Sequence, residues 1–504
     1  MKTAETMWDV IIVGSGPASL AAIHGLEGFT GSILVIDGGM APDDASLEWQ
    51  KSTKDAIVRG GVPPTDYRPT YGLKDTPLKT WFGSSFAQDG HSAITIKTHG
   101  DAGYRPSFAI GGLSNTWGGN CEEFLTRDLE DWPEDVRQLA DHYPQVRSVL
   151  GVDKSTSDDF RVNPLFERML ASRSNRPSRN STGLHRTRVA VRHGVDDFCR
   201  SCGLCLSGCP IDAIFSTREW FAAVAPPGIT LLIGHLATSI MELDDSVEVR
   251  CVRNDQESMT FRCRRLLIAA GPLVSTALAL TALPDGTRAT LEDCQAFSLP
   301  FFSLRSLRST RRHVALAHIA TTFTSGDGRS RGYAQFYDNN EEIRQIVRGV
   351  TRSLRLPAFV ARFLSNHLFA GHGFLSSADS GRIEVSIETV SSANLTIRVE
   401  NRVRRSTKTS MQWVIRRMTR LFLPHGIVPL FPLAHAEPVG RSYHIGTATF
   451  HGENGNSSSD GMGCPPGLSL VHLVDASGLP SMPPQSPTAT IMANAMRIAS
   501  SIRM

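Results

Sequence analysis

The stretch Asp9-Val-Ile-Ile-Val-Gly-Ser-Gly-Pro-Ala-Ser19 places a short β-branched run directly before a glycine-rich turn, and an Ala/Leu-rich segment follows to about Leu26. A second apolar run, Ser32-Ile-Leu-Val-Ile-Asp37, ends in an acidic residue. This order predicts strand, tight turn, helix and strand, the arrangement of a dinucleotide-binding unit on a parallel sheet. The alternative is a glycine turn in an α/β unit that binds no ligand.

Each position of this turn has a physical reason. Gly14 allows the tight turn, and Gly16 lets the backbone approach a pyrophosphate at the positive end of the following helix. Ser19 replaces the third glycine of the usual fingerprint and is small enough for close helix–strand packing. Asp37, 23 residues after Gly14, is placed to accept hydrogen bonds from an adenosine ribose.

The composition is that of a globular protein, with 504 residues of which 41% are hydrophobic and 20% charged. The 52 basic and 49 acidic residues leave a net charge of +3, which gives no electrostatic case for nucleic acid as the main partner. No uncharged apolar stretch approaches the roughly 18 residues of a membrane span, and no signal peptide is recognised. The nine cysteines do not suit a disulfide framework, so we predict a cytoplasmic protein.

Three further motifs occur in the C-terminal part of the chain. They are Ser442-Tyr-His-Ile-Gly-Thr447, Val474-Asp-Ala-Ser-Gly-Leu-Pro480 and Ser486-Pro-Thr-Ala-Thr490, which precedes a helical segment. Together with the N-terminal fingerprint, these motifs resemble the glucose–methanol–choline (GMC) flavin oxidoreductases. Gly111-Gly-Leu-Ser-Asn-Thr-Trp-Gly-Gly-Asn120 resembles the family's glycine-rich segment over the flavin, and Leu266–Ser275 resembles a strand and turn of its FAD domain.

The resemblance implies a fold and its domains. The expected class is α/β (α+β overall), with a Rossmann-like FAD domain that is discontinuous in sequence and a substrate domain with an antiparallel sheet backed by helices. We predict that residues 1–295 and 436–504 form the FAD domain, with a cysteine-rich loop at 196–216, and that residues 296–435 form the substrate domain. Further FAD contacts are implied at Gly112, Ser114, Asn115, Trp117, Gly118, Asn120, Ala270, Asp475 and Ala476.

His444 is the catalytic residue that the resemblance implies. In GMC proteins the matching histidine acts beside the flavin as general base or acid, and an imidazole can take a hydroxyl proton near neutral pH. The alternative is a histidine that only caps a turn. At the second catalytic position, where the family usually carries His or Asn, the resemblance implies Ser486, which could orient the substrate but cannot readily replace a second base. Either His444 acts alone or another side chain supplies the second catalytic group.

The attachment of the flavin is a separate question. Some family members bind FAD covalently through a histidine in the glycine-rich segment, at the position where this sequence has Thr116. A threonine cannot form that bond, so we predict non-covalent FAD.

Four of the nine cysteines, Cys199, Cys202, Cys205 and Cys209, form the pattern C-x2-C-x2-C-x3-C-P, the spacing of bacterial ferredoxin clusters. Zinc and a metal-free structural loop are the alternatives, although zinc sites usually divide two C-x-x-C pairs across a longer loop. One GMC branch carries an iron–sulfur cluster on a pattern that Cys199, Cys205 and Cys209 match, with Cys202 additional. We predict an iron–sulfur cluster of the [3Fe-4S] or [4Fe-4S] type.

The predicted function is that of an FAD-dependent dehydrogenase. It would oxidise an alcohol group of a sugar, polyol or related small metabolite, with electrons leaving through the cluster to a ferredoxin-like or other carrier. An oxidase that reduces O₂ needs no metal, so the cysteine run favours a dehydrogenase. The alternatives are a redox-neutral lyase or isomerase with structural FAD, and a reductase fed by ferredoxin.

The middle of the chain alternates strand and helix patterns. Strands are expected at His313–His318, Gly332–Tyr337, Ile383–Ile387 and Leu395–Val399. Helix is expected over Glu341–Leu375, with a break before Pro357. The basic stretch Arg402–Arg420 has apolar residues at helical spacing, so we interpret it as an amphipathic helix with a solvated face; a docking surface for an acidic ferredoxin is the alternative.

Overall fold

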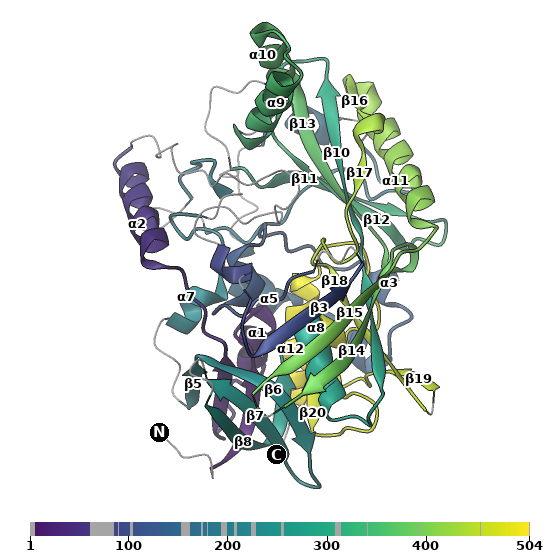
Figure 1. The fold of residues 1–504 in the computed structure, drawn as a ribbon. Coiled ribbons are helices and arrows are strands. Elements are labelled where there is room, and N and C mark those ends of the chain that lie inside the picture. Colours follow the sequence, from purple (N-terminus) through teal and green to yellow (C-terminus); the bar gives the residue numbers. More distant parts are fainter. Residues whose placement is uncertain are drawn as a thin grey trace.

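The computed structural model describes residues 6–60, 85–88, 90–100, 104–152, 162–172, 175–178, 180–192, 199–205, 209–222, 228–253, 257–307, 314–339, 341–391, 393–453 and 455–502. These residues form three β-sheets. Figure 1 shows the first sheet, which contains β1, at one end of the molecule. The second sheet, which contains β10 to β13, lies at the other end, and the third, with β14 and β15, lies between them.

The first sheet is built on β1 (Met7–Val13), which runs parallel to β2 (Ile33–Asp37) and to β8 (Ser258–Ile268). Its strand order is β5-β2-β1-β8-β7-β6, with β20 beside β8. The other strands are β5 (Ile229–Ile233), β6 (His235–Glu242), β7 (Val247–Arg253) and β20 (Val471–Leu473). Because β20 comes from the C-terminal part of the chain, this sheet is discontinuous in sequence, as predicted.

Two helices that are far apart in sequence cover one face of this sheet. α1 (Pro17–Gly25) begins immediately after Gly16, with proline at its first position, where the missing N–H costs nothing. α12 (Thr488–Ser501) packs against it so closely that a Cβ on Gly25 would lie 2.5 Å from the carbonyl oxygen of Met496. The other helices of the first 295 residues are α2 (Asp44–Val58), α3 (Thr126–Leu129), α4 (Glu134–Arg137), α5 (Tyr143–Leu150), α6 (Pro164–Leu170), α7 (Thr217–Ala222) and α8 (Pro272–Thr281).

The second sheet is antiparallel, with strand order β16-β10-β13-β12-β11-β4 and β17 beside β10. Its strands are β4 (His185–Arg186), β10 (Ala296–Ser303), β11 (Ala317–Thr324), β12 (Ser330–Tyr337), β13 (Leu368–Leu375), β16 (Ile427–Pro429) and β17 (His435–Ala436). Helix α11 (Thr407–Phe422) buries Val414, Ile415, Met418 and Phe422 against it. The predictions of an antiparallel sheet backed by helices and of an amphipathic helix within 402–420 are therefore confirmed.

The third sheet joins segments from both sides of the predicted domain boundaries. Its order is β19-β18-β9-β14-β15-β3. The strands are β3 (Ile94–His99), β9 (Arg288–Asp293), β14 (Arg382–Val390), β15 (Leu395–Arg402), β18 (Ile445–Gly452) and β19 (Gly455–Ser458). The predicted β14–β15 pair is confirmed. These two strands from the range 296–435 pair with β9 and β3, which precede that range in the sequence, and β18, which follows it, pairs with β9.

The prediction of helix over Glu341–Leu375 is wrong in its last part. Helices α9 (Glu341–Ser353) and α10 (Ala358–His367) are followed by strand β13, which begins at Leu368. The physical reason lies in Gly371 and Gly373, which are poor helix formers and alternate with larger side chains. A Cβ at Gly373 would lie 2.2 Å from the Phe297 ring, so tertiary packing requires these glycines on one face of a strand.

No helix within the described part of the chain is long and apolar enough to cross a membrane.

Candidate functional site

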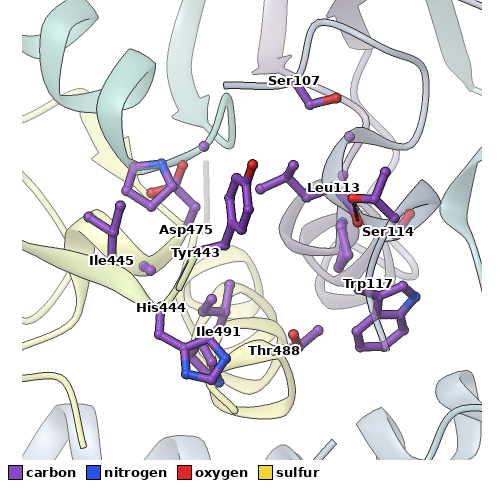
Figure 2. Close-up of a pocket in the computed structure, with 18 of the residues that line it drawn as sticks. Ser107, Leu113, Ser114, Trp117, Tyr443, His444, Ile445, Asp475, Thr488 and Ile491 are labelled. Carbon is purple, nitrogen blue, oxygen red and sulfur yellow. Dashed lines mark hydrogen bonds between the residues drawn. The ribbon is translucent and has the colours of Figure 1, made fainter. Parts of the chain in front are cut away.

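One cavity of about 290 Å³ links the first, second and third sheets. Figure 2 shows Tyr443, His444 and Asp475 on one side of it and Leu113, Ser114 and Trp117 on the other. Of the residues predicted to hold a cofactor or to act in catalysis, most line this cavity: Gly14, Gly16, Asp37, Gly112, Ser114, Trp117, Gly118, Asn120, Ala270, His444, Asp475, Ala476 and Ser486.

One end of the cavity is formed by the turn between β1 and α1. Gly14 has φ +101°, and a Cβ there would lie 2.4 Å from the carbonyl oxygen of Ala269, so only glycine fits. At Gly16 nothing lies within 4 Å of such a Cβ, because this residue faces the open cavity. The N–H groups at the start of α1 are therefore accessible to an anionic group.

Asp37 is buried at the end of β2 and held by two neighbours. Its Oδ2 accepts a hydrogen bond from Ser15 Oγ (2.7 Å), and its Oδ1 accepts one from Gly39 N–H (2.8 Å). Burial raises the pKa of Asp37 to about 6, although both hydrogen bonds lower it. Ser15 also accepts from Gly111 N–H (2.8 Å) and so joins the turn to the glycine-rich segment, a role that the sequence analysis missed.

Two of the predicted cofactor residues do not line the cavity. Ser19 is fully buried within α1, which suits its predicted role in close packing. The side-chain amide of Asn115 donates to the carbonyl oxygens of Ile110 (2.8 Å) and Gly112 (2.7 Å), so it shapes the glycine-rich segment.

Asp475 organises the C-terminal wall of the cavity. Its Oδ1 accepts hydrogen bonds from Ser477 N–H (3.0 Å) and Ser477 Oγ (2.6 Å), and its Oδ2 accepts one from Ser275 Oγ. Burial raises the pKa of Asp475, against the effect of these bonds. The carboxylate therefore ties the segment after β20 to helix α8 and presents the backbone of Asp475 and Ala476 to the cavity.

His444 is a buried imidazole in the cavity wall, and its ring stacks on Phe374 at 4.2 Å and 13°. Burial, and then the charge of His372, lowers the pKa of His444 to about 3, although a hydrogen bond with the Pro484 backbone raises it. Proline has no N–H, so that partner is the Pro484 carbonyl. Among the described residues Nδ1 of His444 has no partner, so Nε2 carries the hydrogen and Nδ1 keeps its lone pair.

The backbone around His444 is held in an unusual conformation. Tyr443 (φ +58°) and Thr447 (φ +50°) both adopt left-handed conformations, which cost side-chain-bearing residues about 1–3 kcal/mol each. Ser442 Oγ accepts from His444 N–H (3.1 Å) and donates to the buried carboxylate of Asp293 (2.7 Å). Such backbone strain persists only where the surrounding structure enforces it. Here the strained backbone on both sides of His444 sets the orientation of its imidazole.

Ser486, the predicted second catalytic residue, lines the cavity but is already engaged. Its Oγ donates to the backbone carbonyl oxygen of Asn120 at 2.7 Å. This hydrogen bond connects the segments of Ser486 and Asn120, which both line the cavity. Because the hydroxyl hydrogen is used in it, Ser486 can only accept hydrogen bonds from a substrate.

His372 on β13 is a titratable group that the sequence analysis missed. It lines the cavity, lies close enough to His444 for its charge to lower the pKa of His444, and meets Phe374 edge-on at 4.6 Å. Its Nε2 is 3.3 Å from Oε1 of Glu437, a carboxylate that also accepts from Ser298 Oγ (3.2 Å). Burial raises the pKa of Glu437, but the contacts with His372 and Ser298 outweigh it and leave the pKa lowered.

The run Gly371-His-Gly373 could have indicated that His372 lies on the opposite face of a strand from its two glycine neighbours. Both glycines face the aromatic core, where a Cβ would meet Phe301 and Phe297, so His372 and Phe374 face the opposite side. The incorrect prediction of helix over this segment concealed that alternation.

The four clustered cysteines lie outside this cavity, in the core that backs the second sheet. Burial raises the pKa of Cys205, and the neighbouring thiols of Cys209, Cys199 and Cys202 raise it further, so the four sulfurs lie near one another. None of the nine cysteines, all of which are described, forms a disulfide.

Backbone N–H groups donate to three of these sulfurs. The distances are 3.4 Å from Ser201 to Cys199, 3.3 Å from Ala315 to Cys205 and 3.3 Å from Ala213 to Cys209. Thiolates and cluster sulfurs accept such bonds, so the donor set suits iron–sulfur chemistry.

The arrangement of these sulfurs does not complete a metal site. Within the described ranges, no group of three or more His, Cys, Asp or Glu side chains is placed to hold a metal ion. Residues 196–198 and 206–208 of the predicted loop lie outside those ranges. We therefore derive no chemical step through a cluster.

The cavity fits FAD in two respects. The accessible start of α1 suits a pyrophosphate, and buried Asp37 suits a ribose. Nδ1 of His444 is a buried polar atom with no partner among the described residues.

Comparison with known proteins agrees with this fold. No family model matches the chain, and no curated protein matches it. Among solved structures, the crystal structure of pyridoxine 4-oxidase from Mesorbium loti is similar over 98% of both chains, with a TM-score of 0.54 and 15% sequence identity. The predicted fold class is confirmed: this chain has the fold of that oxidase over its full length.

Proposed function

We propose that this chain is a GMC-family enzyme that binds FAD and oxidises an alcohol group of a small molecule such as a sugar or polyol. The observation that carries the proposal is a single cavity that joins the Gly14–Gly16 turn to the buried imidazole of His444. The similarity in fold to a protein named as an oxidase supports it.

The proposed reaction converts a carbinol into a carbonyl. When bound, FAD would accept the carbinol C–H hydrogen with its electron pair. The hydroxyl proton goes to Nδ1 of His444, whose lone pair the Pro484 carbonyl keeps available by holding the ring hydrogen on Nε2. The substrate thus loses two electrons and two protons, and its C–O bond becomes a double bond.

We also propose that His372 supplies the second catalytic group that Ser486 cannot. With Nε2 directed at Glu437, its ring is held in one orientation, and Nδ1 is left to hydrogen-bond the substrate oxygen. Glu437 acts only through His372 and is a positioning residue.

The proposed function is tested by anaerobic titration of the flavin-loaded protein with a panel of sugars, polyols and simple alcohols. The flavin absorbance should bleach with at least one alcohol, and the carbonyl product should appear in equal amount. Turnover of a substrate with an unchanged flavin spectrum would instead support a lyase or isomerase and would overturn the proposal.

Replacing His372 with Gln should slow flavin reduction by about 10²-fold, the usual contribution of one acid–base group, while flavin content stays unchanged. Glu437→Gln should slow flavin reduction less, because the His372 ring stays in place but loses the carboxylate that orients it. The matched control is His435→Gln on β17, an exposed histidine outside the cavity. Equal rates for the His372 and control variants would contradict the assignment.

We propose that FAD binds non-covalently. Thr116 lines the cavity where a covalent histidine would stand, and its Oγ donates to the Leu113 carbonyl (3.2 Å). Acid precipitation should therefore release all flavin into the supernatant, measured by its absorbance. A yellow pellet would show a covalent bond and would be inconsistent with this prediction.

We further propose a dehydrogenase rather than an oxidase, with an iron–sulfur cluster at the four cysteines, a ferredoxin-like carrier as partner and a cytoplasmic location. The cysteine spacing and the three N–H···S contacts support the cluster. Iron and acid-labile sulfide should be found after anaerobic purification. If neither iron nor acid-labile sulfide were found, the cluster proposal would be wrong, whereas the proposed flavin reaction would still stand.

A further inference from the structure

Helices α9 and α10 lie at the end of the molecule opposite the first sheet (Figure 1). They and the turn between them expose apolar side chains to solvent. Phe359 exposes 73% of its surface, Leu354 64% and Phe363 51%. Val350 and Leu356 on the same helix pair are also exposed. Single exposed apolar residues are ordinary, but a cluster of them marks an interaction surface.

The apolar surface continues from α10 onto the second sheet. The Phe363 ring lies 6.0 Å from Phe302 and 4.4 Å from His367. Phe302 is in register with Val428 on the edge strand β16, and Val428 is exposed, as is Leu304. We call the exposed residues of α9, of the turn 354–357, of α10 and of β16, together with Leu304, the hairpin face.

The turn between the two helices is well defined. The N–H of Leu356 donates to the Thr351 carbonyl (2.9 Å), and the N–H of Arg355 donates to the Arg352 carbonyl (3.0 Å). Arg355 has φ +52°, the left-handed residue that such a helix end requires and that is usually glycine. The exposed apolar residues are thus held by an ordered structure.

The exposed charged residues at the turn end of the hairpin face have one sign. Arg352, Arg355 and Arg362 are exposed, and no ion pair to them is found among the described residues. The sequence contains no Asp or Glu between positions 343 and 378. The exposed aromatic and aliphatic side chains of this segment therefore lie among arginines, with no carboxylate in the same segment.

We propose that the hairpin face docks on the surface of a membrane that contains anionic lipid. Phe359, Phe363 and Leu354 would enter the boundary between headgroups and acyl chains, and the arginines would lie at the level of the lipid phosphates. This inference does not depend on the proposed enzymatic function.

Other occupants fit the surface less well. A second copy of the chain would place arginines against arginines across a two-fold interface, which is electrostatically unfavourable. An acidic protein would need a hollow to receive a projecting helix pair, whereas a lipid surface adapts to it. The experiment below distinguishes the dimer from the membrane.

The test is co-sedimentation of the full-length, flavin-loaded protein with vesicles. Binding is expected to phosphatidylcholine vesicles that contain phosphatidylserine, and much weaker binding to phosphatidylcholine alone or at high salt. Phe359→Ser with Phe363→Ser should lower the partition coefficient by about tenfold or more, because two buried aromatic rings are lost. Arg355→Gln with Arg362→Gln should lower it by about tenfold on anionic vesicles only.

The matched control replaces two exposed apolar residues far from the hairpin face, Val58 on α2 and Met241 on β6, with Ser. This variant should bind vesicles as the wild type does. Unchanged melting temperature and flavin content show that each variant is folded. Absence of binding to anionic vesicles, or a dimer that dissociates in the Phe359/Phe363 variant, would overturn the proposal.

Discussion

Replacing His444 with Asn should slow anaerobic flavin reduction by about 10³-fold, while flavin content and melting temperature at neutral pH stay close to those of the wild type. The reason is that Nδ1 of His444 keeps a buried lone pair with no partner among the described residues, and the asparagine amide cannot accept a proton in its place. Stopped-flow spectroscopy of the flavin band measures the rate. A variant that reduces its flavin at the wild-type rate would show that another group is the base.

The lowered pKa of His444 also predicts a pH dependence. Because burial and the charge of His372 hold this pKa near 3, the ring stays neutral in the folded protein from pH 8 to well below 6. In the unfolded chain the ring takes up a proton below about pH 6.5. Folding stability should therefore fall as pH decreases from about 6.5 towards 3, and His444→Asn should lose this part of the dependence. Urea unfolding at several pH values measures the difference.

Gly14→Ser and Gly16→Ser should have opposite consequences for stability and flavin binding. At Gly14 the new Cβ would meet the Ala269 carbonyl at 2.4 Å in a left-handed backbone, which should destabilise the fold by about 3 kcal/mol or more. At Gly16 the backbone is extended, the Cβ enters open cavity, and serine is a good N-cap.

Gly16→Ser should therefore fold normally but lose most of its flavin, because its side chain occupies space beside the helix N-terminus. Denaturant unfolding of the flavin-free proteins measures the loss of stability in Gly14→Ser, and the flavin-to-protein ratio measures the loss of flavin in Gly16→Ser. If Gly16→Ser kept its full flavin content, the pyrophosphate would not lie at this turn.

Local sequence was sufficient to place the residues at the glycine-rich end of the cavity. Gly14, Gly16 and Asp37 lie within one strand–turn–helix–strand unit, so their relative positions follow from short-range geometry. The family resemblance singled out His444, which does line the cavity, although periodicity alone would not have distinguished it among 16 histidines.

The position of His372 in the same cavity as His444 could not be predicted in this way. His372 and Glu437 are 65 residues apart, and they meet only because β13 and the segment after β17 lie beside the same strand, β10.

The cysteine run shows the opposite case. Its spacing is recognisable in the sequence, but a metal site requires sulfur positions in three dimensions, and the described residues do not provide them.

The sequence by itself determined the α/β class, the glycine-rich turn after the first strand and the division of the first sheet between the two ends of the chain, because these depend on local pattern and the order of motifs. Only the tertiary structure decided which side chains meet in the cavity. Burial lowers the pKa of His444 to about 3, the Pro484 carbonyl selects its tautomer, and packing against Phe297 and Phe301 turns His372 towards it. These effects arise from groups distant in sequence, since desolvation and long-range contacts exist only after the chain has folded.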